Sequence, residues 1–95
     1  MAKQYCVYIL ANLSNTVTYT GVTSDLLRRI YQHKTGSVDG FTKRYRVTRL
    51  VYYEMYEDAT TAIAREKQIK GGSRLDKTKL VKKANKGWKD LYDEL

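Results

Sequence analysis

The stretch that decides the fold is "YCVYILANLSNTVTYTGV", residues 5–22. Its two arms, residues 5–10 and 16–22, are rich in β-branched and aromatic side chains, which are typical of strands. Between the arms lies "ANLSN", a cluster of turn-forming residues. The stretch therefore predicts a β-hairpin at the start of the chain.

The segment after the hairpin has the signals of a helix. Thr23 or Ser24 can cap its first turn, Asp25 lies in that turn, and Gly36 marks its end. Apolar or aromatic side chains recur on one helical arc: Leu26, Leu27, Ile30 and Tyr31. We expect this arc to form the apolar face of the helix.

One more strand and two more helices are predicted further along the chain. Residues 49–56, "RLVYYEMY", form the most strand-like run and should join the hairpin in a three-stranded sheet. Asp58 caps the next helix, and "GG" at 71–72 ends it, because glycine accepts left-handed backbone angles. Ser73 with Asp76 three places on resembles a capping box that opens a lysine-rich third helix.

The last eight residues, "WKDLYDEL", predict a short terminal helix that docks by one face. The side chains on that face are Trp88, Leu91, Tyr92 and Leu95. The element order is then ββαβαα followed by a short helix, which is an α+β fold.

Composition limits the chain to a few classes of protein. Its 95 residues, 42% of them hydrophobic, suit a single domain spanning residues 1–95. With one cysteine and one histidine, an internal disulfide and a zinc motif are excluded, and Cys6 is expected in a core strand. No stretch approaches the roughly 20 apolar residues of a membrane span. We expect a soluble, cytoplasmic protein that does not bind membranes.

The charge of the chain predicts a polyanionic partner. Eighteen Lys and Arg against ten Asp and Glu give a net charge of +8. Residues 65–86 carry nine of the basic side chains, Lys70 and Lys77 among them, against Glu66 and Asp76. This segment is either a solvated helix face or a surface that contacts phosphates.

A second basic segment, "FTKRYR" at residues 41–46, mixes cations with aromatic rings. Lys43, Arg44 and Arg46 are suited to backbone phosphates, and the two rings to stacking on unpaired bases. The alternative is an ordinary basic loop with its aromatic side chains tucked beneath it. Together with the lysine-rich helix, the segment favours DNA binding.

Glu66 occupies an unexpected position for a carboxylate. Winding the segment at about 100° per residue places it in the middle of an apolar side of the helix. The apolar side chains on that side are Ala59, Ala62, Ile63 and Ile69. Because an unpaired buried charge costs several kcal/mol, a partner is expected. That partner is a cation, or Arg29 in a buried pair, unless the carboxylate reaches solvent at the helix edge.

Polar residues near the start of the chain add to this picture. Arg29 and His33 are four residues apart, so they lie on one side of the first helix, beside its apolar arc. Tyr8 and Tyr19 lie on the two strands of the hairpin, and Gly21 precedes the helix. Taken singly, the tyrosines favour packing roles, and the Arg–His pair favours an ordinary surface.

In combination, these residues resemble the GIY-YIG endonuclease domains, of the small stand-alone kind found in bacteria. The family's first element corresponds to "CVY" at residues 6–8 and its second to "YTG" at residues 19–21, with Tyr8 and Tyr19 eleven residues apart. Cys6 stands where the family pattern has a glycine. This difference is expected to affect local packing more than the chemistry, because the tyrosine of the element is kept. The resemblance covers nearly the whole chain and implies a small mixed sheet flanked by helices.

The resemblance extends to the helices. An arginine ten residues past Tyr19 matches Arg29, and a histidine four residues further matches His33. The family's metal-binding glutamate matches Glu66. A later asparagine matches Asn85, which would brace the site, although an Asn before "KG" is equally suited to end a helix.

The family mechanism, carried over, assigns a role to each matched residue. A Mg²⁺ or Mn²⁺ ion on Glu66 would touch the phosphate and the leaving oxygen, and Arg29 would bind the phosphoryl oxygens. Tyr8 or His33 would take a proton from water, and the sequence leaves that choice open. Tyr19 would orient the water or the base by a hydrogen bond.

Two functional hypotheses follow. The first is a metal-dependent endonuclease that cuts duplex or branched DNA by a one-metal hydrolytic reaction, with a structure-specific role in DNA repair or recombination. The second is a non-catalytic nucleic-acid-binding module that uses the same basic surface. Targeting would depend on DNA structure or on a protein partner, and the sequence does not determine the oligomeric state.

Overall fold

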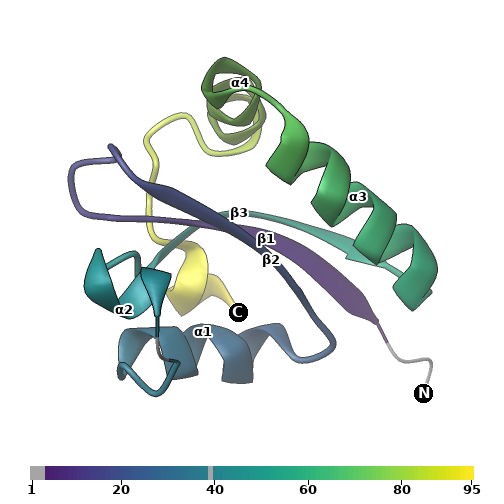
Figure 1. Ribbon diagram of the computed structural model, residues 1–95, viewed down its shortest axis with the longest axis horizontal. Helices are drawn as coiled ribbons and strands as arrows, with labels where there is room; N and C mark the ends of the chain where they lie inside the picture. Colours follow the sequence, from purple (N-terminus) through teal and green to yellow (C-terminus); the bar gives the residue numbers. More distant parts are fainter. Residues whose placement is uncertain (1–3, 39) are drawn as a thin grey trace.

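The hairpin and a later strand form a three-stranded sheet. The computed structural model describes residues 4–38 and 40–95, and the sheet crosses its centre (Figure 1). The strand order is β2-β1-β3, with bounds β1 Tyr5–Ala11, β2 Thr18–Thr23 and β3 Arg49–Tyr56. The predicted three-stranded α+β fold is confirmed. Both neighbours of β1 run opposite to it, so the sheet is antiparallel throughout rather than mixed.

Helices cover both faces of this sheet. Their bounds are α1 Leu26–Lys34, α2 Phe41–Arg44, α3 Ala59–Gly71, α4 Arg74–Ala84 and the 3-10 helix η1 Leu91–Glu94. Figure 1 shows α1, α2 and η1 on one side of the sheet and α3 with α4 on the other. The short α2 lies in the segment that was predicted to be a loop. Within the described residues, none of the helices combines the length and apolar character needed to cross a membrane.

The central strand β1 is buried on both faces, which explains its continuous apolar run. Successive side chains of a strand point to opposite faces. One face packs against α1 in a core made of Cys6, Tyr8, Leu10, Leu26, Ile30, Val47 and Leu50. The other face packs against α3 and α4 in a core made of Val7, Ile9, Ala11, Val51, Ala62, Ile69 and Val81. Cys6 is buried in the first core, as predicted.

Three of the described α-helices, α1, α3 and α4, begin at side-chain caps. Asp25 itself caps α1, accepting from the backbone NH of Arg28, so neither Thr23 nor Ser24 is the cap. The cap at Asp58 and the Ser73–Asp76 capping box are both confirmed: Asp58 accepts from Thr61, and Ser73 and Asp76 bond reciprocally.

The end of α3 differs from its prediction. Gly72 has an extended backbone with φ −77°, so a left-handed angle is not what ends the helix. A Cβ atom at Gly72 would lie 3.3 Å from the Asp76 carboxylate and 3.3 Å from the Ile69 carbonyl. The glycine therefore makes room for the capping box of the next helix.

The buried lines of α1 and α3 are rotated from the predicted arcs. In α1 the buried side chains are Leu26, Ile30 and His33, whereas Leu27 and Tyr31 are exposed. In α3, Ala62 and Ile69 are buried, whereas Ile63 is exposed. In each helix the inward-facing residues follow the i, i+4, i+7 spacing, so one narrow stripe of side chains packs against the sheet. Glu66 lies on the α3 line, between its two buried residues.

The C-terminal segment passes from one face of the sheet to the other. Trp88, at φ 53°, packs beside the α3–α4 core, whereas Leu91 and Tyr92 pack beside the α1 core. Leu95 is exposed. The predicted single-faced helix is therefore wrong, and only the one-turn helix η1 forms. Because the segment runs from one face of the sheet to the other, it has large apolar side chains for both cores.

Candidate active site

Strand pairing places Tyr8 against Gly21. The β1–β2 register puts these two residues opposite each other. A Cβ atom built on Gly21 would lie 2.5 Å from both Cζ and Oη of Tyr8 and 3.0 Å from a ring carbon of Tyr19. The Tyr8 ring therefore extends across the neighbouring strand, in space that only a glycine leaves open.

The hydroxyl of Tyr8 begins a buried chain of polar contacts. It lies 3.2 Å from Nε2 of His33, and Nδ1 of His33 lies 3.0 Å from Oγ1 of Thr42. All three side chains are at least 97% buried. If Tyr8 donates to Nε2, the neutral imidazole carries its proton on Nδ1 and donates to Thr42. The contacts join β1, α1 and α2 in one line.

Thr42 was missed by the sequence analysis. It lies in α2, within the "FTKRYR" segment, whose charges and rings drew attention to a surface role. Its contact with His33 joins residues nine positions apart across a loop. No spacing rule for helices or strands relates such a pair, so the sequence held no signal for it.

Tyr19 completes an aromatic cluster around His33. Its ring centroid lies 5.7 Å from that of His33 and 6.3 Å from that of Tyr8, and the Tyr8 and His33 centroids are 5.9 Å apart. Tyr19 is only partly buried. The structure therefore brings together three of the candidate site residues: the two hairpin tyrosines and His33.

Arg29 and Glu66 act electrostatically on the same hydroxyl. Burial raises the pKa of Tyr8, hydrogen bonding to Arg29 lowers it, and the charges of Tyr19 and Glu66 raise it further, so that the net shift is upward. Burial and the charge of Arg29 lower the pKa of His33 below its ordinary value of 6.5. Near neutral pH, Tyr8 is therefore a neutral phenol and His33 a neutral imidazole.

Glu66 lies beside this cluster with few partners of its own. Its side chain is 13% exposed, and Oε1 lies 3.5 Å from Nζ of Lys70, one helical turn later. Among the described residues, this ion pair is with Lys70 and not with Arg29. The prediction of a partly desolvated carboxylate agrees with the structure.

The site fits a divalent cation held by one carboxylate. Residues 4–38 and 40–95 contain no group of three or more His, Cys, Asp or Glu that would hold a metal by themselves. Mg²⁺ commonly keeps several waters and uses one or two carboxylates together with substrate phosphates. Glu66, whose ion partner among the described residues is the exposed ammonium of Lys70, has the oxygen atoms that such an ion would use.

Comparison with known proteins identifies the family. Residues 4–80 match the family model of the GIY-YIG catalytic domain. The chain belongs to the GIY-YIG family. GIY-YIG domains are nuclease domains, so the tyrosines, Arg29, His33 and Glu66 lie in a nuclease-type catalytic domain.

Several relatives of this GIY-YIG chain are UPF0213 proteins. One from Staphylococcus haemolyticus is 41% identical over 81 residues, which cover 85% of this chain and 96% of the relative. One from Syntrophus aciditrophicus is 39% identical over 83 residues, covering 86% and 93%. The solution NMR structure of a UPF0213 protein from Bacillus halodurans is 30% identical, covers 92% of each chain and has a TM-score of 0.58.

The structure shows what surrounds Cys6 and Asn85, the two positions at which the match to the GIY-YIG pattern was least clear. Cys6, in place of glycine, is buried, and its Sγ lies 2.8 Å from Sδ of Met55. Asn85 is the C-cap of α4, and its Nδ2 donates to the carbonyls of Val51 and Lys89 at 3.0 and 2.7 Å. Because its amide bonds to backbone, Asn85 braces the fold, and its hydrogen bonds to described residues go to Val51 and Lys89 rather than to Glu66.

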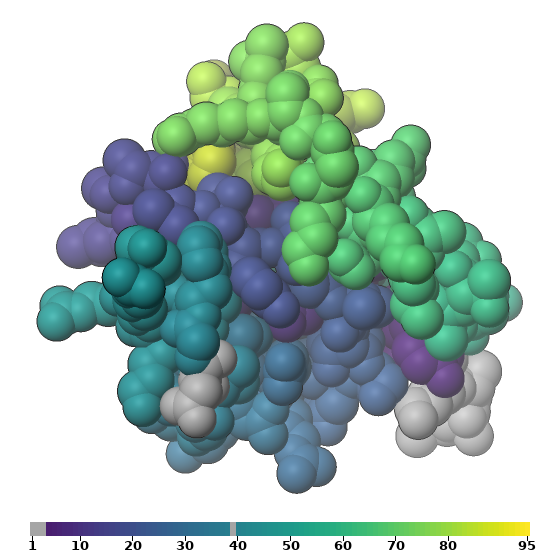
Figure 2. All heavy atoms as spheres, in the orientation of Figure 1, coloured from purple at the N-terminus to yellow at the C-terminus, as the bar shows by residue number. Residues whose placement is uncertain are grey.

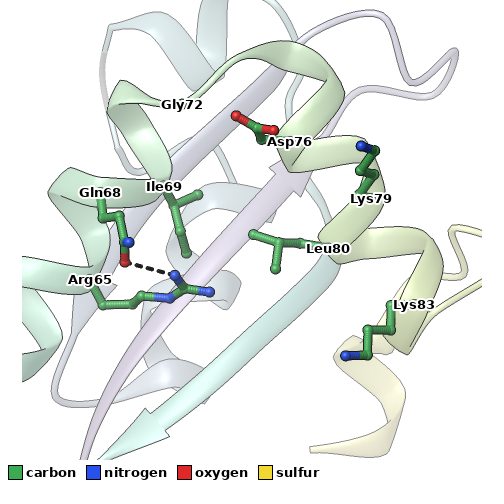
Figure 3. A pocket seen from close by; sticks show the side chains of 8 residues that line it. All are labelled: Arg65, Gln68, Ile69, Gly72, Asp76, Lys79, Leu80 and Lys83. Carbon is green, nitrogen blue, oxygen red and sulfur yellow. Dashed lines mark hydrogen bonds between the residues drawn. The ribbon is translucent and has the colours of Figure 1, made fainter.

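Two of the hollows on the described surface of the GIY-YIG domain bear on function. A groove of about 360 Å³ separates α3 from α4, and Figure 3 shows Ile69 and Leu80 facing across it. None of the tyrosines lines it. A second cavity of about 350 Å³ is lined by Tyr19, together with Lys70 and Lys77 from the predicted nucleic-acid-binding set. Lys43, Arg44 and Arg46, from the same set, are exposed on or just after α2.

Proposed function

We propose that this chain is a divalent-metal-dependent DNA endonuclease that hydrolyses phosphodiester bonds with one Mg²⁺ or Mn²⁺ ion on Glu66. The observation that supports this most is the buried contact chain of Tyr8, His33 and Thr42 beside Arg29 and Glu66. Five side chains from four elements converge there, although no structural need of the sheet requires a polar chain in its core.

The pKa directions favour His33 as the final proton acceptor. A phenol with a raised pKa is a poor base alone, whereas a neutral imidazole is a competent one. Tyr8 takes a proton from the attacking water while its own proton passes to Nε2 of His33. The water oxygen forms the new P–O bond, and the bond to the departing oxygen breaks with its electron pair left on that oxygen. Thr42 then accepts a hydrogen bond from Nδ1 and stabilises the imidazolium.

The remaining residues position the phosphate. Arg29 binds the phosphoryl oxygens through its guanidinium, whose charge already acts on both Tyr8 and His33. Tyr19, partly buried beside His33, orients the water by a hydrogen bond. Glu66 would hold the divalent cation, which would supply Lewis-acid stabilisation of the charge on the phosphoryl and leaving oxygens.

The test is plasmid nicking with Mg²⁺ or Mn²⁺, with and without EDTA, for the wild type and Arg29→Ala. Nicking that needs the metal and disappears in the variant, while DNA binding is retained, supports the enzyme. Failure of the wild type to cut branched, flapped, nicked or single-stranded DNA would instead favour the non-catalytic binding module.

We further propose that residues 1–95 act as one nuclease domain on duplex or branched DNA. We propose that the basic surface and the aromatic cluster contact the DNA. These contacts suit the substrates of repair or recombination. A protein partner for targeting and the cytoplasmic location stay predictions. A panel of junctions, flaps and damaged duplexes tests which DNA substrate is preferred.

A further inference from the structure

The cavity beside Tyr19 has the features of a binding site for a single flat ring. It is lined by Thr18, Tyr19, Thr20, Phe41, Lys70 and Lys77. Figure 2 shows strand β2, in blue, between the teal α2 segment and the green α3 and α4 helices that form its sides. Its volume of about 350 Å³ lies at the lower end of the range of small-molecule sites, about 300–1,000 Å³.

We infer that this cavity binds one unstacked nucleobase of the DNA strand, that of a nucleotide adjoining the cleaved phosphate. The inference rests on the proposed function, because it takes DNA to be the substrate. It adds a base-binding subsite and assigns Phe41 and Thr20 to it.

Phe41 provides the stacking surface. Its ring is 46% exposed, although it lies only 6.4 Å from the ring of Tyr19 and 4.9 Å from that of Tyr45, centroid to centroid. An apolar ring held by two neighbours while half its surface meets water is a platform on which any base can stack. Tyr45 in turn has the Arg44 guanidinium 5.4 Å from its centroid, which adds positive charge to the platform.

The cations at the cavity suit the phosphates on either side of a base. Lys70 holds its Nζ 5.6 Å from the Tyr19 ring centroid, and Lys77 donates to the Gly72 carbonyl at 3.0 Å. No acidic residue is among the described residues that line the cavity. A peptide added to the edge of β2 would have no need of two ammonium groups, whereas a nucleotide would use both.

The cavity adjoins the proposed catalytic site. Lys70 lines it and also lies 3.5 Å from the Glu66 carboxylate. Tyr19 lines it and also packs 5.7 Å from His33, centroid to centroid. A base in the cavity is therefore one side chain away from the residues assigned to the cleaved phosphate, which limits it to a neighbouring nucleotide.

Thr20 offers an unused polar group at the base of the cavity. Its Oγ1 is buried and has no hydrogen-bond partner among residues 4–38 and 40–95. A buried hydroxyl without a partner is costly, and groups of this kind are few in native proteins. A base that enters the cavity brings the ring nitrogens and carbonyls that this hydroxyl can bond once its side chain rotates.

The test is an abasic scan of a bound oligonucleotide, measured by fluorescence anisotropy with the full chain in EDTA. Each oligonucleotide lacks one base but keeps all its phosphates. We expect one position at which removal of the base weakens wild-type binding roughly tenfold, because base–aromatic stacking has that strength. In Phe41→Ala the same removal should have little effect. Tyr31→Ala, which removes an exposed ring on α1, should behave as the wild type.

Two results would overturn the inference. In the first, removal of a base changes the affinity of the wild type equally at every position. In the second, removal of the base at one position weakens binding by the same factor in the wild type and in Phe41→Ala. Nicking is measured separately with metal. A chain that shows the positional effect but never nicks would retain the pocket and refute the proposed endonuclease.

Thr20→Val gives an independent readout, because it nearly preserves shape and removes only the unpaired hydroxyl. We expect its melting temperature to equal or exceed that of the wild type, since no protein partner is lost. Its affinity should fall at the position that the abasic scan identifies, and by different factors for different bases there. Unchanged affinity for every base would remove Thr20 from the subsite and overturn that part of the inference.

Discussion

Two glutamates at the contact between α3 and the sheet are almost equally buried, but their surroundings differ. The Glu54 side chain is 18% exposed and that of Glu66 is 13% exposed. Glu54 accepts hydrogen bonds from the hydroxyls of Tyr52 and Tyr56 and two from Arg65, at 2.9 and 3.0 Å. Although burial alone would raise the pKa of Glu54, these bonds hold it at about 2.

Among the described residues, Glu66 has a single ion partner, Lys70, at 3.5 Å. A carboxylate whose lone pairs are already used by the protein stabilises the fold, whereas one with unused oxygens can take a ligand. The difference teaches that burial alone does not identify a functional carboxylate. The number and geometry of its partners do so.

The largest expected effect is a split between these two glutamates. Glu66→Gln should lower the nicking rate roughly a thousandfold or more, because the proposed cation loses its charged ligand. Glu54→Gln should keep near-wild-type nicking but lose about 2 kcal/mol of stability, because it breaks a charged hydrogen-bond network. Nicking rates and urea denaturation of both variants check this. If Glu66→Gln and Glu54→Gln nick DNA at equal rates, then the partners of these two glutamates do not separate a catalytic carboxylate from a structural one.

The next effect concerns the proton pathway. Tyr8→Phe should lower the nicking rate about 10²- to 10⁴-fold, because it removes the hydroxyl that faces His33. In the wild type, the pKa of His33 is lowered below 6.5. The nicking rate should therefore stay constant as the pH is lowered from 7 to 6.5, and it should fall only at lower pH, where His33 becomes protonated. A pH–rate profile measures this. An acid limb centred above pH 6.5 would contradict the role of His33.

Local sequence patterns predicted the elements that depend on neighbouring residues. The hairpin, the Asp58 cap and the Ser73–Asp76 capping box depend on residues a few positions apart, and all three are confirmed. The candidate site residues were chosen by their order along the chain, through the resemblance to GIY-YIG domains. A helical wheel also placed Glu66 on the buried line of α3.

Features that depend on distant segments were not predicted. Arg65 bonds to Glu54 on β3, a contact that the basic character of residues 65–86 did not indicate. Thr42 meets His33 across a loop, and Trp88 packs on the face opposite Leu91. Each depends on where a second element lies in space, which periodicity along one element does not encode.

A smaller effect is expected at Gly21, with Gly71 as a matched control. Gly21→Ala would place a methyl group 2.5 Å from the Tyr8 hydroxyl, and that ring is too deeply buried to move aside. We expect a loss of about 1–3 kcal/mol of stability and a fall in nicking, because Tyr8 is displaced from His33. Gly71→Ala meets nothing within 4 Å and should be neutral or stabilising. Thermal denaturation and nicking separate the two, and an equally stable Gly21→Ala would refute the close approach of Tyr8.

The smallest effect is the pH dependence of stability that Glu54 confers. Its pKa is about 2 in the folded protein and near 4.5 when unperturbed, so the unfolded state binds the proton first. The contribution of Glu54 is therefore fully present above about pH 5 and is lost as the pH falls through 4.5 toward 2. Denaturation of the wild type and Glu54→Gln between pH 7 and pH 2.5 measures this as a difference that narrows on acidification. A difference that stays constant over this range would mean that Glu54 is not held ionised by Arg65, and the contrast with Glu66 would then lose its electrostatic basis.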